Sequence, residues 1–516
     1  MKKFSIAFLL FIISNTNTFA QISSTQVDEL VNRTLTAFNV PGIAVAIVKD
    51  GKIVLAKGYG VKSILTKEKV DANTLFGIAS NSKAFTSAAL AILVDEGKIK
   101  WDDKVIQYLP NFRMYNDYVT QEFTIRDLLT HRSGLGLGAG DLMIWPDGSN
   151  FTAEDITKNL QYLKPVSAFR TKYDYDNLLY IVAGEVVHIA SGNSWCDFIE
   201  ERIMKPLEMN NSAASFLRLK DTTNIIAPHV PIDGKLRVIK RYQNQLFDAA
   251  AGIYSSVNDL SKWVILQMNN GKYGIDNKQL FSVKEHNEMW QLQTIIPVTT
   301  KAPYYTHFSG YGLGWFLSDV KGYKQATHTG GLEGIVTQVT LVPELQLGII
   351  VLTNQQSGAA FTAITNTIKD SYLGIKSEDY VTIYSNRLKA NEETADKVTD
   401  EVWATVAKNN KAKIKIDFNT LKGTFNDNWF GEIVLSEKKG KLYFASARSP
   451  QLNGEVFFYK VGNFVVKWNN AYFHADAHLF FEYDATGKAI GIKMKPISEL
   501  TDFSYDFQDL DFKRVQ

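Results

Sequence analysis

The chain has 516 residues, of which 45% are hydrophobic, 12% aromatic and 21% charged. This hydrophobic content excludes a largely disordered chain, and the length predicts two or three domains at roughly 100–200 residues each. The 56 basic and 54 acidic residues give a formal net charge of +2, without the basic excess that binding to nucleic acid or to an anionic membrane surface requires. We therefore expect a globular protein with no nucleic-acid partner.

The N-terminus has the pattern of an export signal. Lys2 and Lys3 form a charged start, residues 4–13 form a short apolar core, and Ala20 is a small residue of the kind that signal peptidase requires. This core is too short to anchor the chain, because a membrane span needs about twenty apolar residues. The single cysteine, Cys196, excludes an intramolecular disulfide and a lipid-modified cysteine after the signal. We predict cleavage near Ala20 and a periplasmic or secreted protein without stable membrane insertion.

The elements that follow the signal predict one sheet built from two distant segments. Residues 26–39 form a plausible helix, and residues 43–57 form a hairpin, because an Asp-Gly turn separates two runs rich in β-branched residues. Residues 77–270 are mostly helical in pattern, and residues 310–352 return to strands. Strands at both ends with helices between them indicate a sheet that is interrupted by a helical insertion.

The composition changes twice toward the C-terminus. Residues 376–412 are charged and helix-prone, which predicts a helical linker after a first domain over residues 21–375. Residues 413–516 alternate short apolar strands with Gly, Asn and Asp turns, which predicts a small all-β domain, either a barrel or a sandwich. The predicted organisation is therefore a signal peptide over residues 1–20, a first domain, a helical linker and an all-β domain.

A Ser-x-x-Lys pattern occurs three times, and only its context distinguishes the copies. Ser80 and Lys83 alone open a long helix-forming run, residues 84–94. Because Lys83 lies one turn after Ser80 near the positive end of this helix, partial burial there lowers its pKa, and a neutral amine can take the Ser80 proton. The alternative is a helix-capping serine followed by a solvated lysine. The other two copies are Ser318 with Lys321 and Ser436 with Lys439.

The second candidate element is Tyr175-Asp176-Asn177, within an aromatic-rich segment. Residues two apart in an extended segment point the same way, so the Tyr175 phenol and the Asn177 carboxamide can both face the Lys83 amine. Beside a cation the phenol is expected to lose its proton more easily and to act in acid–base transfer. The alternative is an aromatic loop that packs against helices.

The third candidate element is His328-Thr329-Gly330-Gly331, on a predicted edge strand before a hairpin. Its glycines let the backbone approach a substrate closely, and the amides of Gly331 and Ser80 are candidates for an oxyanion hole. The alternative is a turn between strands with a surface histidine. Each element has such an alternative, but the occurrence of all three in this order favours one shared catalytic site.

Together these elements resemble the three motifs of the serine β-lactamase and penicillin-binding protein superfamily. The motifs here are Ser80-x-x-Lys83, Tyr175-x-Asn177 and His328-Thr329-Gly330. The likeness is to the class C-like branch and covers about residues 25–372, and the tail resembles a lipocalin-like module. The resemblance implies an α+β fold in which an antiparallel sheet flanked by helices meets an all-helical lobe. The active site is expected between them, and a small all-β barrel-like domain is expected after them.

By this resemblance Ser80 is the nucleophile that forms an acyl intermediate, and Lys83 is its base. Tyr175 passes protons to the leaving group and helps to activate the deacylating water. Asn177 binds a substrate amide and orients Lys83. The chain lacks the Glu-x-x-Leu-Asn segment that supplies a deacylation base in class A enzymes, so the resemblance implies deacylation through Tyr175 and Lys83.

The resemblance also places His328, Thr329 and Gly330 on the substrate-binding strand, where many members carry lysine in place of His328. A neutral imidazole holds a substrate carboxylate less firmly than a fixed cation. We therefore expect an amide or ester hydrolase acting on D-amino-acid peptides or small esters, with a small molecule or peptide as its partner. A class C β-lactamase and a non-catalytic penicillin- or peptidoglycan-binding module are the alternatives. No metal or organic cofactor is expected.

Two further residues and one group of three carry weaker signals. His131 falls in a segment that also resembles the family, and we expect it to support the fold. Asn354 ends a strand near the expected site and is expected to cap a turn. The spacing of His474, Asp476 and His478 would put three metal ligands on one face of a strand. We favour the alternative that these are polar residues of a hairpin.

Overall fold

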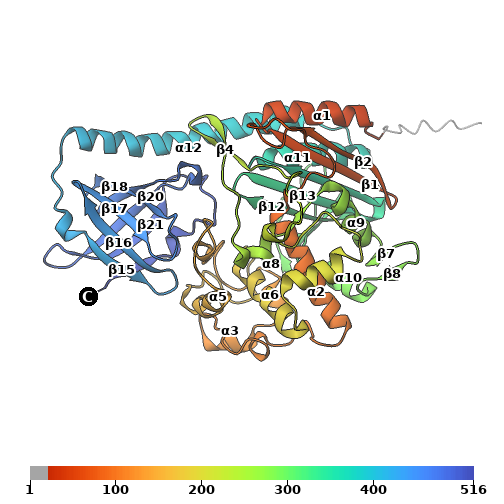
Figure 1. Cartoon of the computed structure of the whole chain (residues 1–516), viewed down its shortest axis with the longest axis horizontal. Helices are drawn as coiled ribbons and strands as arrows, with labels where there is room; N and C mark the ends of the chain where they lie inside the picture. Colours follow the sequence, from red (N-terminus) through yellow and green to blue (C-terminus); the bar gives the residue numbers. More distant parts are fainter. Residues whose placement is uncertain (1–20, 516) are drawn as a thin grey trace, which may run out of the picture.

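The computed structural model describes residues 21–515, so the predicted signal peptide lies outside the described residues. The first domain contains an antiparallel sheet of eight strands in the order β2-β1-β14-β13-β12-β11-β10-β9 (Figure 1). The sheet combines strands from both ends of the domain, as predicted. Its strands are β1 (Gly42–Lys49), β2 (Lys52–Gly60), β9 (Thr294–Ile295), β10 (Ser309–Tyr311), β11 (Phe316–Val320), β12 (Tyr323–Leu332), β13 (Ile335–Val342) and β14 (Leu347–Thr353).

Helices cover both faces of the sheet at its centre. One face packs against α1 (Ser24–Ala37) and α11 (Gly358–Tyr372), and the other face packs against α9 (Val257–Met268). Alternate β1 residues point to the two sides, so that Val45 packs beneath α1 and α11 while Ala46 faces the helical side. This double burial explains why β1 is a continuous apolar run and not an alternating one.

The chain between β2 and β9 forms a helical lobe around the buried helix α2. Residues on all sides of α2 are buried, which fits a sequence of small and apolar residues without a polar stripe. The helices of this lobe are α2 (Ser82–Asp95), α3 (Asp117–Glu122), α4 (Ile125–Leu128), α5 (Ala153–Asn159), α6 (Leu178–Ser191), α7 (Trp195–Ile199), α8 (Asp248–Ala251) and α10 (Val283–Met289). Short strand pairs join β3 (Phe76–Gly77) to β6 (Tyr254–Ser255), β4 (His229–Ile232) to β5 (Lys235–Val238), and β7 (Lys272–Tyr273) to β8 (Lys278–Gln279).

β12, which carries His328, is not the edge strand that the sequence predicted. It pairs with β13 on one side and with β11 on the other, and β10 and β9 lie beyond β11. The prediction was wrong because these additional strands are short and separated by turns, and they were not resolved in the sequence pattern. Pairing with β11 stops at Thr327, which leaves residues 328–332 paired on one side only.

The second half of β12 packs directly against the 3₁₀ turn η1 (Ala79–Asn81). A Cβ on Gly330 would lie 2.3 Å from Ile78 O and 2.6 Å from Thr337 Oγ1, so this close approach requires glycine. Thr337 Oγ1 also donates to Ile78 O at 2.8 Å and accepts from Asn81 Nδ2 at 2.9 Å. The sheet therefore fixes the position of the turn that precedes α2.

One long helix, α12 (Tyr380–Lys411), connects the two domains in the region of the predicted linker (Figure 1). Its 32 residues pack on α11 and α1 at one end and on strand β18 (Asn453–Lys460) at the other. Most of its surface is exposed and charged between these ends. Within residues 21–515, no helix combines the length and the apolar character that crossing a bilayer requires.

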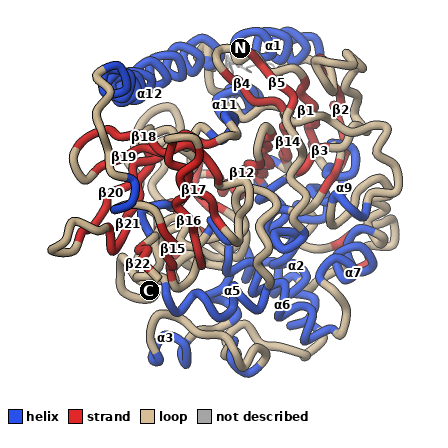
Figure 2. Tube along the Cα trace, turned by 60° about the vertical axis from the view of Figure 1, so that its left-hand side comes forward, coloured by secondary structure: helices blue, strands red, loops and turns tan. Residues whose placement is uncertain are grey.

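The C-terminal domain is a closed barrel of eight antiparallel strands in sequential order, β15 to β22 (Figure 2). Its residues alternate as expected: Leu442 and Phe444 point inward and are buried, whereas Lys441 and Ala445 are exposed. The predicted barrel-like all-β domain is therefore confirmed. The other strands are β15 (Gly423–Asp427), β16 (Gly431–Lys438), β17 (Lys441–Ser446), β19 (Asn463–Trp468), β20 (Ala477–Tyr483), β21 (Ala489–Pro496) and β22 (Asp511–Arg514).

The barrel packs against the helical lobe beside α5. Arg448 of the barrel donates to Asn150 Oδ1 at 2.6 Å and to Asp155 Oδ2 at 2.8 Å. The rings of Phe151 and Phe430 meet across the same boundary, with centroids 6.2 Å apart. Buried residues of the lobe and of the barrel belong to one contiguous hydrophobic cluster. The two domains therefore form one packed unit.

Replacing Gly330 with alanine is expected to lower the free energy of unfolding by about 1–3 kcal/mol, because the new Cβ would meet Ile78 O and Thr337 Oγ1. Urea-induced unfolding measures this change. The matched control is Gly331→Ala on the same strand, where an added Cβ would meet nothing within 4 Å. Equal destabilisation by the two variants would contradict the close packing of β12 on η1.

Candidate active site

Ser80 and Lys83 lie together where the chain enters α2. Ser80 belongs to η1, and the preceding residue, Ala79, has a φ of 52°, in the left-handed region that residues other than glycine rarely adopt. Lys83 Nζ lies 3.1 Å from Ser80 Oγ. Ser80 keeps 9% of its surface exposed, whereas Lys83 is fully buried. The turn thus holds the hydroxyl against the buried amine.

The Lys83 amine is bound by acceptors of the protein and is removed from water. Nζ lies 2.8 Å from Asn177 Oδ1 and 3.2 Å from Ala250 O. Burial lowers the pKa of Lys83 to about 7, although the nearby carboxyl groups of Asp141 and Asp176 act in the opposite direction. A substantial fraction of the amine is therefore neutral near pH 7, and it can accept a proton from the neighbouring hydroxyl.

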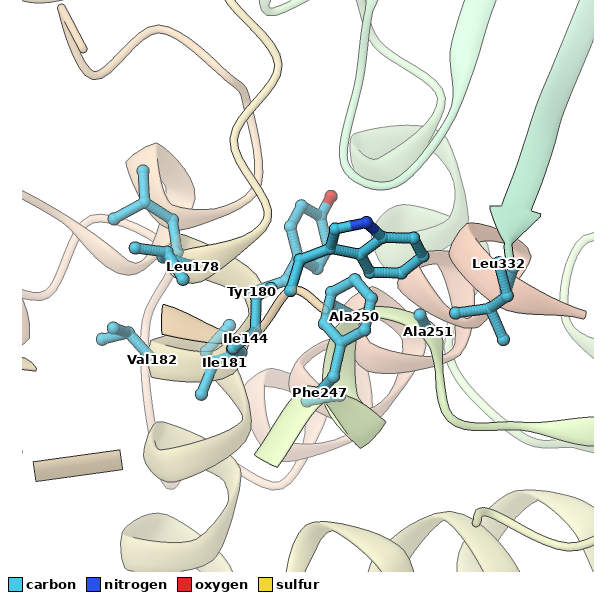
Figure 3. Close-up of a cluster of buried hydrophobic side chains, with 14 of the residues drawn as sticks. Ile144, Leu178, Tyr180, Ile181, Val182, Phe247, Ala250, Ala251 and Leu332 are labelled. Atoms are coloured by element: carbon cyan, nitrogen blue, oxygen red, sulfur yellow. The ribbon is translucent and has the colours of Figure 1, made fainter. Parts of the chain in front are cut away.

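Apolar side chains enclose this amine. The rings of Tyr180 and Phe247 have their centroids 5.2 Å and 6.0 Å from Lys83 Nζ. Figure 3 shows both rings in one hydrophobic cluster with Ala250 and with Leu332 at the end of β12. This surrounding of rings and aliphatic groups is the physical cause of the lowered lysine pKa, because it disfavours the charged form.

Tyr175 lies beside the same amine, as predicted from its spacing to Asn177, but its acidity differs from the expectation. Lys83 Nζ is 4.8 Å from the centroid of the Tyr175 ring. Burial raises the pKa of Tyr175 well above its ordinary value, whereas the sequence predicted easier proton loss. Desolvation outweighs the attraction of an amine that is itself only partly charged. The phenol therefore stays protonated near neutral pH and can donate a proton.

His328 uses both ring nitrogens within the protein. Nδ1 lies 2.6 Å from Thr329 O, and because a carbonyl only accepts, Nδ1 carries the hydrogen. Nε2 then accepts from the Tyr311 hydroxyl, 2.8 Å away. Burial lowers the pKa of His328 to about 3, so the ring is neutral at physiological pH. At 1% exposure its ring has no nitrogen left for the substrate carboxylate that the sequence assigned to it.

The remaining residues of the third motif line the same strand. Thr329 and Gly331 are exposed, whereas Gly330 is buried against the η1 turn. An added Cβ on Gly331 would meet no atom within 4 Å, so the space beside this residue is open. Thr329 and Gly331 thus lie on the open face of the strand, opposite the face that packs against the turn. The oxyanion hole formed by the amides of Ser80 and Gly331 stays a prediction.

Sequence reasoning missed two residues of this site. Asp141, in the short turn η3 (Asp141–Met143), accepts from Asn177 Nδ2 at 2.7 Å and thereby orients the carboxamide that faces Lys83. Tyr311 binds His328. It begins the segment Tyr311-Gly312-Leu313-Gly314-Trp315, which also resembles the family, and this resemblance could have indicated it. Asp141 gives no such signal, because its contact with Asn177 depends on the folded loop.

The weaker candidates have structural roles in this part of the molecule. His131 is fully buried, accepts from Asp176 N at 3.1 Å, and packs against the tilted ring of Tyr175 with centroids 4.2 Å apart. Asn354 accepts from Gly42 N at 2.7 Å and so joins the ends of β14 and β1.

The metal alternative in the tail does not fit the geometry. His474 ends a short 3₁₀ turn with a φ of 48° and contacts Pro231 O, and only His478 lies on strand β20. Asp476 accepts from Trp468 N. Within residues 21–515, no group of three or more His, Cys, Asp or Glu side chains is arranged to hold a metal ion.

Comparison with known proteins matches both domains to families. Residues 27–373 match the family described as Beta-lactamase, and residues 407–514 match one described as a domain of unknown function (DUF3471). The lipocalin-like assignment of the tail stays a prediction.

An unguisins hydrolase of Aspergillus campestris is 29% identical over 362 residues, which cover 67% of this chain and 65% of that protein. Protein flp of Staphylococcus aureus is 28% identical over 343 residues, which cover 65% of this chain and 64% of that protein. The chain thus spans slightly less than two thirds of the length of these relatives. The structure of the octameric penicillin-binding protein homologue from Pyrococcus abyssi aligns with a TM-score of 0.60 at 20% identity, over 95% of this chain and 100% of that one. This likeness shows a shared fold.

Lys83→Met is expected to abolish turnover and to raise the free energy of unfolding at pH 7 by roughly 1–3 kcal/mol, because the folded protein no longer buries an amine. The lysine pKa is lowered from 10.5 to about 7 by folding, so between these values the unfolded chain binds more protons than the folded one. The stability gain should therefore shrink as the pH rises through this window. Urea unfolding at both ends of the window measures it, and no gain at pH 7 would contradict the buried-amine description.

The acid limb of the pH–activity profile is expected near pH 7, with activity falling about tenfold per unit below it, because a protonated Lys83 cannot accept the Ser80 proton. His328 should not contribute to this limb, because its pKa is about 3. The measurement is kcat/KM against pH for the wild type and for His328→Gln. A limb that disappears in this variant would assign the titration to the histidine.

Proposed function

The chain belongs to the beta-lactamase family, and from this premise we propose that it is an exported serine hydrolase that cleaves amide or ester bonds through an acyl-Ser80 intermediate. The observation that carries the proposal is the contact of a serine hydroxyl with a buried amine. Ser80 Oγ lies 3.1 Å from Lys83 Nζ, whose pKa is lowered to about 7. This combination generates a nucleophile at neutral pH without a metal ion.

The acylation step uses the proton positions described above. Neutral Lys83 accepts the Ser80 proton while Ser80 Oγ bonds to the carbonyl carbon of the substrate. When the bond to the leaving group breaks, the leaving nitrogen or oxygen takes a proton from the Tyr175 phenol, and the Lys83 ammonium returns a proton to Tyr175. The result is an ester at Ser80, a protonated leaving group and a neutral amine.

Deacylation reverses the roles of these groups. Water attacks the acyl carbon while Lys83, with Tyr175 beside it, accepts the water proton. The bond from Ser80 Oγ to the acyl carbon then breaks, and the serine oxygen regains a proton from the amine. The amides of Ser80 and Gly331 are the proposed donors that stabilise the negative oxygen in both steps.

D-amino-acid peptides or small esters are the proposed substrates, in preference to antibiotics. The position that carries lysine in many β-lactamases holds His328, whose ring is neutral and engaged with Tyr311 and Thr329. The site therefore offers no fixed cation at this position for the carboxylate of a β-lactam. The rings of Tyr175, Tyr311 and Phe316 pack around His328, and Tyr173 packs against Tyr311. They suit an apolar or aromatic acyl group.

Export is proposed from the sequence pattern of the N-terminus. Lys2 and Lys3, the apolar residues 4–13 and the small residue Ala20 support cleavage and release into the periplasm or the medium. Cell fractionation followed by N-terminal sequencing tests this part, and a protein that retains Met1 in the cytoplasmic fraction would refute it.

The reaction itself is tested with wild type and Ser80→Ala on a p-nitrophenyl ester, D-Ala-containing peptides and a chromogenic cephalosporin. Wild type should turn over the ester or the peptides, with an adduct on Ser80 detected by mass spectrometry, and Ser80→Ala should lose at least about a thousandfold in kcat. The matched control is Ser436→Ala, which removes the serine of another Ser-x-x-Lys pattern, on strand β16 of the barrel. This variant should keep wild-type activity.

The outcomes separate the candidate functions. Unchanged turnover in Ser80→Ala would discard the mechanism. Faster hydrolysis of the cephalosporin than of ester and peptides would establish the β-lactamase alternative. A stable adduct without turnover would establish the non-catalytic binding module.

A further inference from the structure

A segment of the C-terminal barrel enters the active-site region of the first domain. The connection between β21 and β22, residues 497–510, places Phe503 beside Tyr175, with ring centroids 5.9 Å apart. The carbonyl oxygen of Phe503 also lies against Gly138, where an added Cβ would come within 2.7 Å of it. This segment therefore lines the wall next to the catalytic phenol.

Two side chains of the segment bind the loop that carries Asp141. Asp506 accepts hydrogen bonds from Gly140 N at 2.6 Å and from Leu142 N at 3.0 Å. Ser504 Oγ donates to Asp141 Oδ2 at 2.8 Å. All three bonds are buried, so water cannot replace them without movement of the segment. The geometry of the loop thus depends on the barrel.

Asp141 transmits this contact to the catalytic amine. Its Oδ2 atom also accepts from Asn177 Nδ2 at 2.7 Å, and Asn177 Oδ1 lies 2.8 Å from Lys83 Nζ. A continuous series of hydrogen bonds therefore runs from Ser504 through Asp141 and Asn177 to Lys83. Every member of the series is buried, which makes its bonds strong and its loss costly.

From this geometry we propose that Ser504 and Asp506 are positioning residues for the catalytic amine, and that the barrel completes the active site. Ser504 orients the Asp141 carboxyl group, and that group orients the Asn177 carboxamide. Asp506 holds the backbone of the same loop. The proposal rests on the proposed hydrolase function, and it extends the site to residues outside the matched beta-lactamase region.

The charges around this series of hydrogen bonds determine whether a change at Ser504 raises or lowers the pKa of Lys83. Asp141 raises the pKa of Lys83, and the Ser504 bond lowers the pKa of Asp141, which burial raises. Removing the Ser504 hydroxyl raises the pKa of Asp141 and favours its uncharged form. The pKa of Lys83 then falls, because an uncharged Asp141 no longer stabilises the ammonium form. The other titratable groups that interact with Lys83 or Asp141 are Asp176, Asp506, His131, His328, Tyr175, Tyr180 and Tyr242.

The first test is Ser504→Ala in the full-length protein. We expect kcat to fall about tenfold with KM less affected, because the amine loses its fixed orientation. We also expect the acid limb of the kcat/KM profile to move to lower pH by about half a unit, because Lys83 then loses its proton more easily. The matched control is Ser498→Ala in the same connection, whose hydroxyl accepts from Leu500 N at an exposed position. It should keep the wild-type profile.

A second variant, Asp506→Asn, tests the backbone contact. The asparagine keeps one acceptor, but its amide group would face the second backbone N–H as a donor, so one of the bonds to Gly140 and Leu142 is lost. We expect a reduced kcat with a melting temperature within a few degrees of the wild type. If either variant lowers only the melting temperature and leaves kcat and the pH profile unchanged, the connection contributes to stability alone and the proposal fails.

A measurement without substrate separates this proposal from the proposed function. In protein labelled with 13C at the lysine Cε position, the Lys83 signal is identified by its absence in Lys83→Met, and its titration is followed by NMR. A lower midpoint in Ser504→Ala than in Ser498→Ala supports the positioning role even if no hydrolase substrate is found. Identical midpoints in the two variants would overturn that role, whether or not the wild type hydrolyses the test substrates.

Discussion

The active site depends on keeping one amine away from water in a state where it can lose its charge. Lys83 is fully buried, and it is tolerated there because Asn177 Oδ1 and Ala250 O lie within 3.2 Å of it. The apolar helix α2 and the rings around it remove solvent, and the carboxyl groups at Asp141 and Asp176 moderate the effect. The pKa of Lys83 is therefore set by two opposing effects of the surrounding elements, desolvation and nearby negative charge.

The sheet fixes the position of the turn that carries Ser80. Gly330 lets β12 lie directly against the turn that contains Ser80, and Thr337 binds the backbone of that turn. Because β12 stops pairing with β11 at Thr327, its second half stays available beside the serine. The residues of this half of β12 therefore alternate: Gly330 packs on the turn, whereas Thr329 and Gly331 are exposed.

The sequence was sufficient for the architecture and for the residues whose contacts are local. The hairpin, the helical insertion, the all-β tail and the position of Lys83 one turn after Ser80 follow from periodicity and from helix geometry. The choice of a barrel and of a catalytic pair depended on the family resemblance. The pKa direction of Tyr175 and the edge position of β12 were wrong, because burial and strand order are set by segments far away in the chain. Ser504 and Asp141 are separated by 363 positions, and no pattern in either segment indicates their contact.

The uninterrupted connector α12 limits how this molecule can vary. An α-helix turns by about 100° and rises about 1.5 Å with each residue. One inserted or deleted residue would swing the barrel around the connector axis and carry Ser504 away from Asp141. Exposed α12 residues are thus free to change in identity, whereas their number is restricted to values that preserve the helical phase between the two ends.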